Sequence, residues 1–108
     1  MELNFLISVL DRDRADDMTA IYKDHNLPMI VTFLGRGTAR SEHLDLYGLQ
    51  ATEKAVVATV ADGEKTKQII RSAKRKLFID IPGNGVMMAV PVKSVGGGRT
   101  LAYLTDNT

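Results

Sequence analysis

Residues 83–100 have the sequence GNGVMMAVPVKSVGGGRT, and this stretch decides the expected fold. A turn bracketed by Gly83 and Gly85 is followed by an apolar run, Val86 to Val92, and then by a glycine-rich segment that ends beside Arg99. The run has the length of one strand, so the two glycine-rich loops are expected at its opposite ends. Such loops let backbone N–H groups converge on an anion, and arginine adds a charged donor fork. Glycine turns also flank strands for purely steric reasons, so the pattern alone is a weak signal.

Length and composition indicate an ordinary globular domain. The 108 residues suffice for one domain over 1–108, and 44% hydrophobic with 25% charged residues excludes the disordered classes. The absence of cysteine excludes disulfides, thiolate metal sites and cysteine nucleophiles. The apolar run 5–10 lacks a basic start and is too short for a signal or membrane segment, so we expect a cytoplasmic protein. A net charge of +1 predicts no broad nucleic-acid surface.

The order of apolar patterns predicts four strands and two helices. Strands are expected over 3–10, 29–34, 54–61 and 86–92, and helical spacing of apolar residues is found over 15–25 and 66–77. This βαββαβ order, with two right-handed crossovers, places both helices on one face of a four-stranded antiparallel sheet. The expected class is α+β with the ferredoxin-like arrangement.

Several polar residues stand where the helices should begin or end. Asp11 or Asp13 is placed to cap the first helix, Asn26 tolerates the left-handed conformation after it, and Asp62 is placed to cap the second. The residues expected on the buried face of the second helix are Thr66, Ile69, Ile70, Ala73 and Leu77, and its basic residues are expected on the solvated face.

In the predicted strands, both sets of alternate residues are apolar, so both faces of the sheet should be apolar. Phe5, Ile7 and Val9 alternate with other apolar residues, and Val57 follows Val56 directly. A sheet with one solvated face would show clean alternation, so the second face needs a cover that two helices on the first face do not provide. Self-association is the economical answer, and a charge at Val57, or at Val56 if the parity is reversed, should break the assembly.

The segment 37–52 combines glycine, charges and hydroxyl residues without a sustained period. We therefore expect a long connection, which in a compact domain is usually functional or mobile. The C-terminal segment 94–108 is rich in glycine near its start and is expected to be a flexible connection or part of a site.

These segments together resemble the nitrogen-regulatory P-II signalling proteins, most closely their divergent P-II-like members. The resemblance covers residues 3 to about 100. Gly35 and Gly37 match the G-x-G that opens the family's long loop, 83–85 stands where the family has Gly-Asp-Gly, and Arg99-Thr100 stands where it has Arg-x-Arg-Thr. The resemblance implies a ferredoxin-like homotrimer without enzymatic activity that takes part in signal transduction.

The resemblance also implies a site in the clefts between subunits for an adenine nucleotide (ATP, ADP or AMP) or a related small anion, with no required cofactor. The implied nucleotide-binding residues are Gly35, Gly37, Thr38, Lys54, Gly83, Asn84, Gly85, Arg99 and Thr100. The long loop would contact a membrane transporter or metabolic enzyme through Arg40, Glu42, His43, Asp45 and Tyr47. Leu46 and Leu49 beside Tyr47 favour simple packing of that ring over a modification site.

Three positions depart from the family's pattern. Val86 replaces a lysine that contacts phosphate, Gly97 replaces the first arginine of the C-terminal pair, and Ala39 replaces the glutamine that organises magnesium and 2-oxoglutarate. The loss of two cations predicts weaker binding of a triphosphate than in typical members. The alanine argues against sensing of 2-oxoglutarate.

Two other functions share the expected architecture. A trimeric metal-binding protein of the divalent-cation-tolerance type needs clustered ligands, and His25 and His43 form a poor set. A small enzyme with a site at the subunit junction needs an acid or base, but Ser41, His43 and Asp45 lie along one loop rather than on separate scaffold elements. We therefore expect neither a metal site nor a catalytic site.

Overall fold

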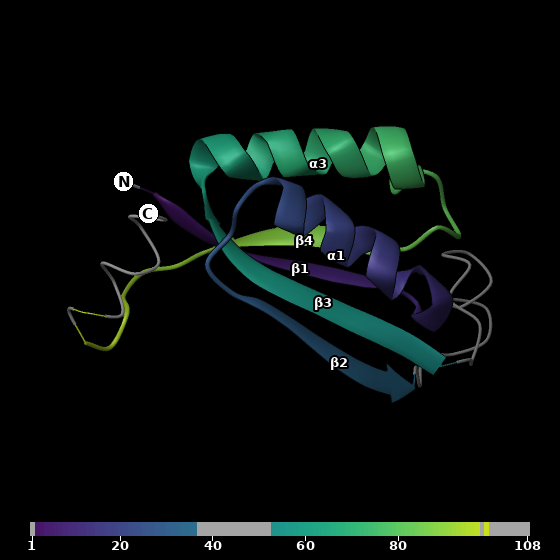
Figure 1. The fold of residues 1–108 in the computed structure, drawn as a ribbon, viewed down its shortest axis with the longest axis horizontal. Coiled ribbons are helices and arrows are strands. Elements are labelled where there is room, and N and C mark those ends of the chain that lie inside the picture. The colour runs from purple at the N-terminus through teal and green to yellow at the C-terminus, as the bar shows by residue number, and fades with distance from the viewer. Residues whose placement is uncertain (1, 37–52, 98, 100–108) are drawn as a thin grey trace.

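Two helices cover one face of a four-stranded sheet in the computed structural model, which describes residues 2–36, 53–97 and 99 (Figure 1). In chain order the elements are β1 (Leu3–Asp11), a 3-10 turn η1 (Arg12–Arg14), α1 (Ala15–Asp24), β2 (Ile30–Arg36), β3 (Glu53–Asp62), α3 (Gly63–Leu77) and β4 (Val86–Pro91). The predicted loop 37–52 lies outside the described residues.

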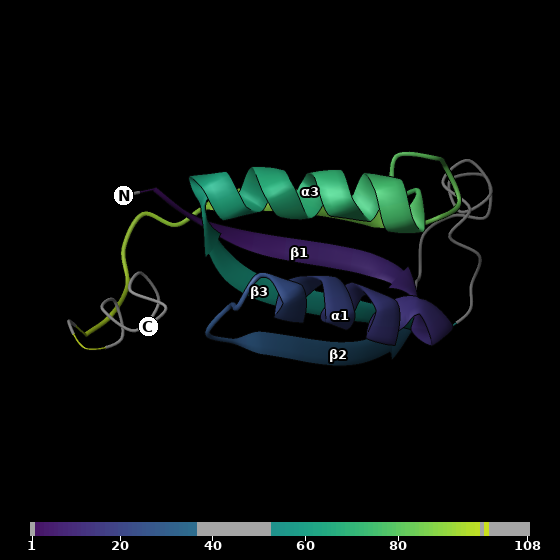
Figure 2. The ribbon, with the colours of Figure 1, turned by 45° about the horizontal axis from the view of Figure 1, so that its top comes forward.

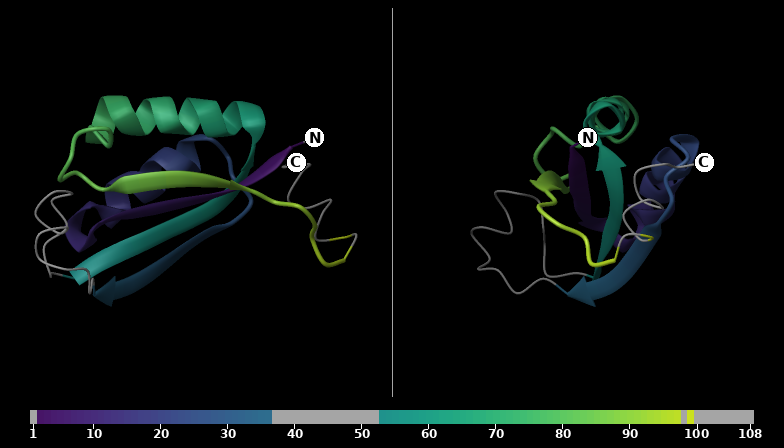
Figure 3. Two further views of the ribbon diagram at one scale, coloured as in Figure 1. Left: turned by 180° about the vertical axis from the view of Figure 1, so that it is seen from behind. Right: turned by 90° about the vertical axis from the view of Figure 1, so that its left-hand side faces the viewer.

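The strands are ordered β2-β3-β1-β4, and each neighbouring pair is antiparallel. Figure 2 shows α1 and α3 side by side over the same face, with β1 and β3 beneath them. Seen from behind in Figure 3, the other face carries no helix of the described residues. This topology confirms the predicted ferredoxin-like fold. Pro91 ends β4, which is an edge strand and so tolerates a residue without an N–H.

The core lies between the helices and alternate residues of the two central strands. Leu6, Leu10 and Val57 are at most 1% exposed. They belong to one cluster with Met18 of α1 and Ile69 of α3. Burial of each such side chain contributes about 1.5–3 kcal/mol to folding.

A buried pair of hydroxyl groups crosses this core. The oxygens of Ser8 and Tyr22 are 2.6 Å apart, and the Tyr22 hydroxyl donates to the carbonyl of Val57 at 3.4 Å. Burial raises the pKa of the Tyr22 phenol, and the hydrogen bond from Ser8 opposes part of that rise. The pair satisfies both polar side chains and ties α1 to both central strands.

Two of the predicted helix-end signals are confirmed. Asn26 has a φ of 54°, the left-handed conformation expected just after the C-terminal end of α1. The carboxylate of Asp62 accepts a hydrogen bond from the N–H of Lys65 at 2.8 Å, as an N-cap residue does.

The predicted cap of the first helix is wrong. The turn η1 comes between β1 and α1, so Arg14 occupies the N-cap position and no side chain caps it. The carboxylate of Asp11 instead pairs with Lys54 on the neighbouring strand. A tertiary ion pair has thus replaced the local cap that the sequence pattern indicated.

The remaining boundaries shift by one or two residues. The second strand is Ile30–Arg36 rather than 29–34, and the third is Glu53–Asp62 rather than 54–61. On α3, Ile70 is half-buried and Ser72 is buried in its place, because the helix sits slightly rotated from the predicted apolar face.

The face of the sheet opposite the helices is apolar across all its strands. Phe5, Ile7 and Val9 pair with Val60, Ala58 and Val56 of β3 and with Val90, Met88 and Val86 of β4. We call this set, with Val31 and Phe33 of β2, the open face. Its outer members remain exposed, Phe33 to 59% and Met88 to 44%. This confirms that the strands are apolar at both parities, and it assigns Val56 to the open face and Val57 to the core.

Candidate functional site

Four chain segments meet at the end of the sheet where β1 stops. Gly35 of β2 pairs with Lys54 of β3, and Lys54 pairs with Asp11 of β1. Gly85 lies at the same end, because a Cβ built on it would be 2.9 Å from the carbonyl oxygen of Val9. The structure therefore places at one end of the sheet five of the nucleotide-site residues implied by the resemblance, namely Gly35 and Lys54 on β2 and β3 and Gly83, Asn84 and Gly85 before the far edge strand β4.

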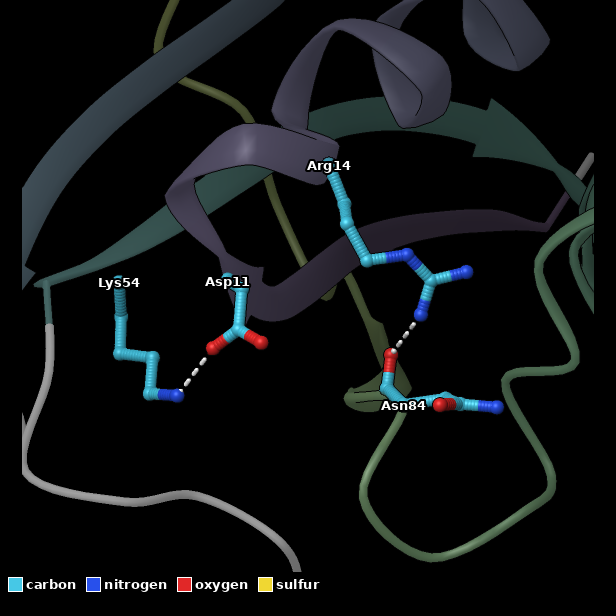
Figure 4. A network of polar contacts seen from close by, with 4 residues as sticks. All are labelled: Asp11, Arg14, Lys54 and Asn84. Carbon is cyan, nitrogen blue, oxygen red and sulfur yellow. Dashed lines mark hydrogen bonds and ion pairs between the residues drawn. The ribbon is translucent and has the colours of Figure 1, made fainter.

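The ammonium group of Lys54 already has a partner. Its Nζ forms an ion pair with Oδ1 of Asp11, and the lysine side chain is only 7% exposed (Figure 4). Next to it, on the solvent side, Arg12 forms an ion pair with Glu53. A ligand that recruits Lys54 must therefore compete with a carboxylate or share the ammonium with it.

The segment after α3 is a tightly bonded turn. Phe78 ends the helix with a φ of 53°, and its carbonyl accepts bonds from the N–H of Ile81 at 3.0 Å and from the side-chain amide of Asn84 at 3.1 Å. The N–H of Asn84 in turn donates to the carbonyl of Ile81 at 3.1 Å. Gly83 and Gly85 have φ values of 102° and 125°, a backbone conformation that residues other than glycine rarely adopt.

The turn leaves two backbone donors for a ligand. Within the described part of the chain, the N–H groups of Gly83 and Gly85 donate to no acceptor, whereas that of Asn84 is used inside the turn. Backbone donors on either side of a fixed residue are a common way to bind a phosphate oxygen. The steric explanation for the glycines also holds, because Gly85 has no room for a side chain.

Arg14 is a site residue that the sequence reasoning missed. Its guanidinium donates from Nη2 to the carbonyl of Leu77 at 2.7 Å and from Nη1 to the carbonyl of Asn84 at 3.0 Å, the second bond being drawn in Figure 4. The partners are 63 and 70 residues away along the chain. No local pattern predicts contacts of such range.

Two hollows adjoin this end of the sheet. The larger has a volume of about 640 Å³ and is lined by Asp11, Arg12, Asp13 and Glu53. The smaller, of about 290 Å³, is lined by Arg12, Leu34, Gly35 and Glu53. The larger hollow alone has the volume of a small-ligand pocket. Because three of these lining residues are carboxylates, which repel phosphate, a bound phosphate would have to be held by the donors of the turn 83–85.

Arg99 lies away from these residues. The segment that leads to it leaves β4 at the opposite end, where Pro91 pairs with Asn4 and the N–H of Val92 donates to Leu3 at 2.9 Å. Figures 1 and 3 show this segment and the turn of residues 83–85 at opposite ends of the sheet. One subunit therefore does not bring Arg99 to the turn, and its side chain is exposed.

The other implied residues lie outside the described residues. These are Gly37, Thr38, Arg40, Glu42, His43, Asp45, Tyr47 and Thr100. Among the residues with described positions, no three His, Cys, Asp or Glu side chains form a group able to hold a metal ion, and a ring nitrogen of His25 bonds the carbonyl of Ile21 at 2.9 Å. No helix in the described ranges has the length and apolarity needed to cross a membrane.

The chain matches no protein-family model, and no curated protein is significantly similar to it. The likeness to P-II proteins therefore rests on the residues quoted above and stays a prediction.

Proposed function

We propose that this protein is a P-II-like regulator that binds an adenine nucleotide or a related small anion and passes the signal to a transporter or metabolic enzyme. The observation that carries this function is the meeting of Gly35, Lys54 and the turn of residues 83–85 at one end of the sheet. These segments are far apart in sequence, and a hollow of about 640 Å³ lined by Asp11, Arg12, Asp13 and Glu53 lies at the same end of the sheet.

The site is completed by a second copy of the chain. Arg99 lies at the far end of its own subunit, so it reaches a turn only if another subunit brings it there. The open face supplies a reason for association, because Phe33, Met88 and Val90 are each at least 44% exposed. A homotrimer with its sheets around a threefold axis, as the resemblance implies, covers this face and places ligands between subunits.

We expect ATP to bind weakly and the variant Val86→Lys to bind it more tightly. Val86 is the half-buried first residue of β4, at the end of the open face, so a lysine there can extend its ammonium past the sheet to the turn. It would restore a charged contact, and each such hydrogen bond contributes about 1.5–3 kcal/mol, roughly 10- to 150-fold in affinity. Titration calorimetry with ATP, ADP and AMP measures both proteins. If neither the wild type nor Val86→Lys binds ATP, ADP or AMP, the proposed function is contradicted. We leave Gly97 unchanged, because its φ of 88° would strain an arginine.

We also expect removal of residues 40–45 to abolish partner binding without loss of assembly. The segment is polar and aperiodic, so its loss should change the melting temperature by no more than about 4 °C. Affinity capture with intact and shortened chains, followed by identification of the bound proteins, measures the first effect, and sedimentation measures the second. Dissociation of the shortened chain into subunits would instead make the segment part of the interface.

A further inference from the structure

We propose that Arg14 is a positioning residue for the anion-binding turn, with its guanidinium fork orienting the peptide between Asn84 and Gly85 toward the ligand. This inference rests on the proposed function, because the ligand is the phosphate of the nucleotide. Neither the sequence pattern nor the family resemblance assigned a role to Arg14.

The two bonds of Arg14 fix both ends of the segment that carries the turn. Nη2 holds the last residue of α3 through the Leu77 carbonyl at 2.7 Å, and Nη1 holds the Asn84 carbonyl at 3.0 Å. The planar guanidinium sets the separation of the two carbonyls, which a flexible ammonium group does not. The half-buried Arg14 is itself the last residue of η1, which directly follows β1 in the centre of the sheet.

The bond to Asn84 decides the direction of a neighbouring donor. The carbonyl of Asn84 and the N–H of Gly85 belong to one trans peptide plane and point in opposite directions. With the carbonyl held by Arg14, the N–H is turned away from the guanidinium and is left without an acceptor in the described residues. Asn84 is also held by its N–H and its side-chain amide, so this orientation is fixed at three points.

Arg14 also brings positive charge close to the turn. In the described ranges it forms no ion pair with a carboxylate, in contrast to Arg12 and Lys54. The guanidinium stays charged at every relevant pH and favours an anion at the turn. It partly replaces the cation that Val86 does not supply.

The variants Arg14→Lys and Arg14→Met separate the fork from the charge. Lysine keeps the charge but does not bridge two carbonyls in a fixed geometry, so both variants should loosen the turn. The heteronuclear NOE of the Gly83 and Gly85 amides should fall below that of the β4 amides in both variants and match it in the wild type. The dissociation constant for ATP should rise about tenfold in Arg14→Lys and further in Arg14→Met, which also loses the positive charge. Arg71→Lys, on the exposed face of α3, is the matched control and should change neither quantity.

An Arg14→Lys protein that equals the wild type in amide NOE and ATP affinity would overturn the positioning role. Circular dichroism checks that each variant is folded, and if methionine prevents folding the lysine variant still decides the question. If the wild-type protein binds no ATP, the proposed nucleotide binding is contradicted, whatever Arg14 does. The amide measurement then still decides whether Arg14 orders the turn, because it needs no ligand.

Discussion

An aspartate at residue 57 should unfold the protein, whereas an aspartate one residue earlier should only separate its subunits. Val57 is 0% exposed and lies in the cluster between the sheet and the helices. Val57→Asp therefore loses about 1.5–3 kcal/mol of apolar burial and adds a penalty of several kcal/mol for a buried carboxylate. This sum is comparable to the total stability of a small domain, about 5–15 kcal/mol.

Val56 faces the other way. It pairs with Val9 and Phe33 on the open face and is half-buried in a single subunit. The carboxylate of Val56→Asp is solvated in a free subunit but would be trapped between sheets in the assembly. We therefore expect a folded single chain, with a circular dichroism spectrum close to that of the wild type.

Sedimentation velocity and thermal melting of both variants test this contrast. Val56→Ile keeps an apolar side chain at the same position and should sediment as the wild-type assembly does. A wild-type protein that sediments as a folded monomer at micromolar concentration would refute the expected trimer. Equal loss of folding in Val56→Asp and Val57→Asp would instead show that residue 56 belongs to the core of one subunit.

The fold was predictable from the sequence because each level of pattern agreed with the next. The helical spacing of Met18, Ile21 and Tyr22 is matched by their burial, and Asp62 caps α3 as its position indicated. The parity of β3 was not predictable, because Val56, Val57 and Ala58 form a continuous apolar run. Such a run indicates two covered faces but not which residues point to which face.

The candidate site was predictable only in part. The resemblance grouped Gly35, Lys54 and the turn of residues 83–85, and the strand register brings them to one end of the sheet. The ion pair of Lys54 with Asp11 and the two bonds of Arg14 depend on side chains from distant segments. Sequence spacing carries no information on such contacts, and for this reason Asp11 was wrongly expected to cap a helix.

Replacing Gly85 with alanine should destabilise the protein strongly. The residue has a φ of 125°, and its added Cβ would lie 2.9 Å from the carbonyl oxygen of Val9 and 3.2 Å from Cβ of Leu10. Both atoms belong to β1, a central strand paired on both sides, so neither moves away easily. Backbone strain of about 1–3 kcal/mol and overpacking of a similar size add to about 2–6 kcal/mol.

Gly63→Ala is the matched control, because it makes the same chemical change without the same geometry. Gly63 is the first residue of α3, and a Cβ there meets nothing within 4 Å. Alanine at that position should leave stability unchanged or raise it by about 0.4–1 kcal/mol, since it restricts the unfolded chain. The two variants should therefore shift stability in opposite directions or by clearly unequal amounts.

Thermal melting at one fixed protein concentration measures both variants, because the proposed association would make the midpoint concentration-dependent. A loss of about 2–6 kcal/mol corresponds to a midpoint lowered by roughly 10 °C or more in Gly85→Ala. Since the same strain displaces the N–H of residue 85, ATP affinity should fall below that of the wild type at a temperature where the variant is still folded. A Gly85→Ala protein that melts with the wild type would mean that the turn relaxes at little cost, and its backbone donors would then not be held in place for an anion.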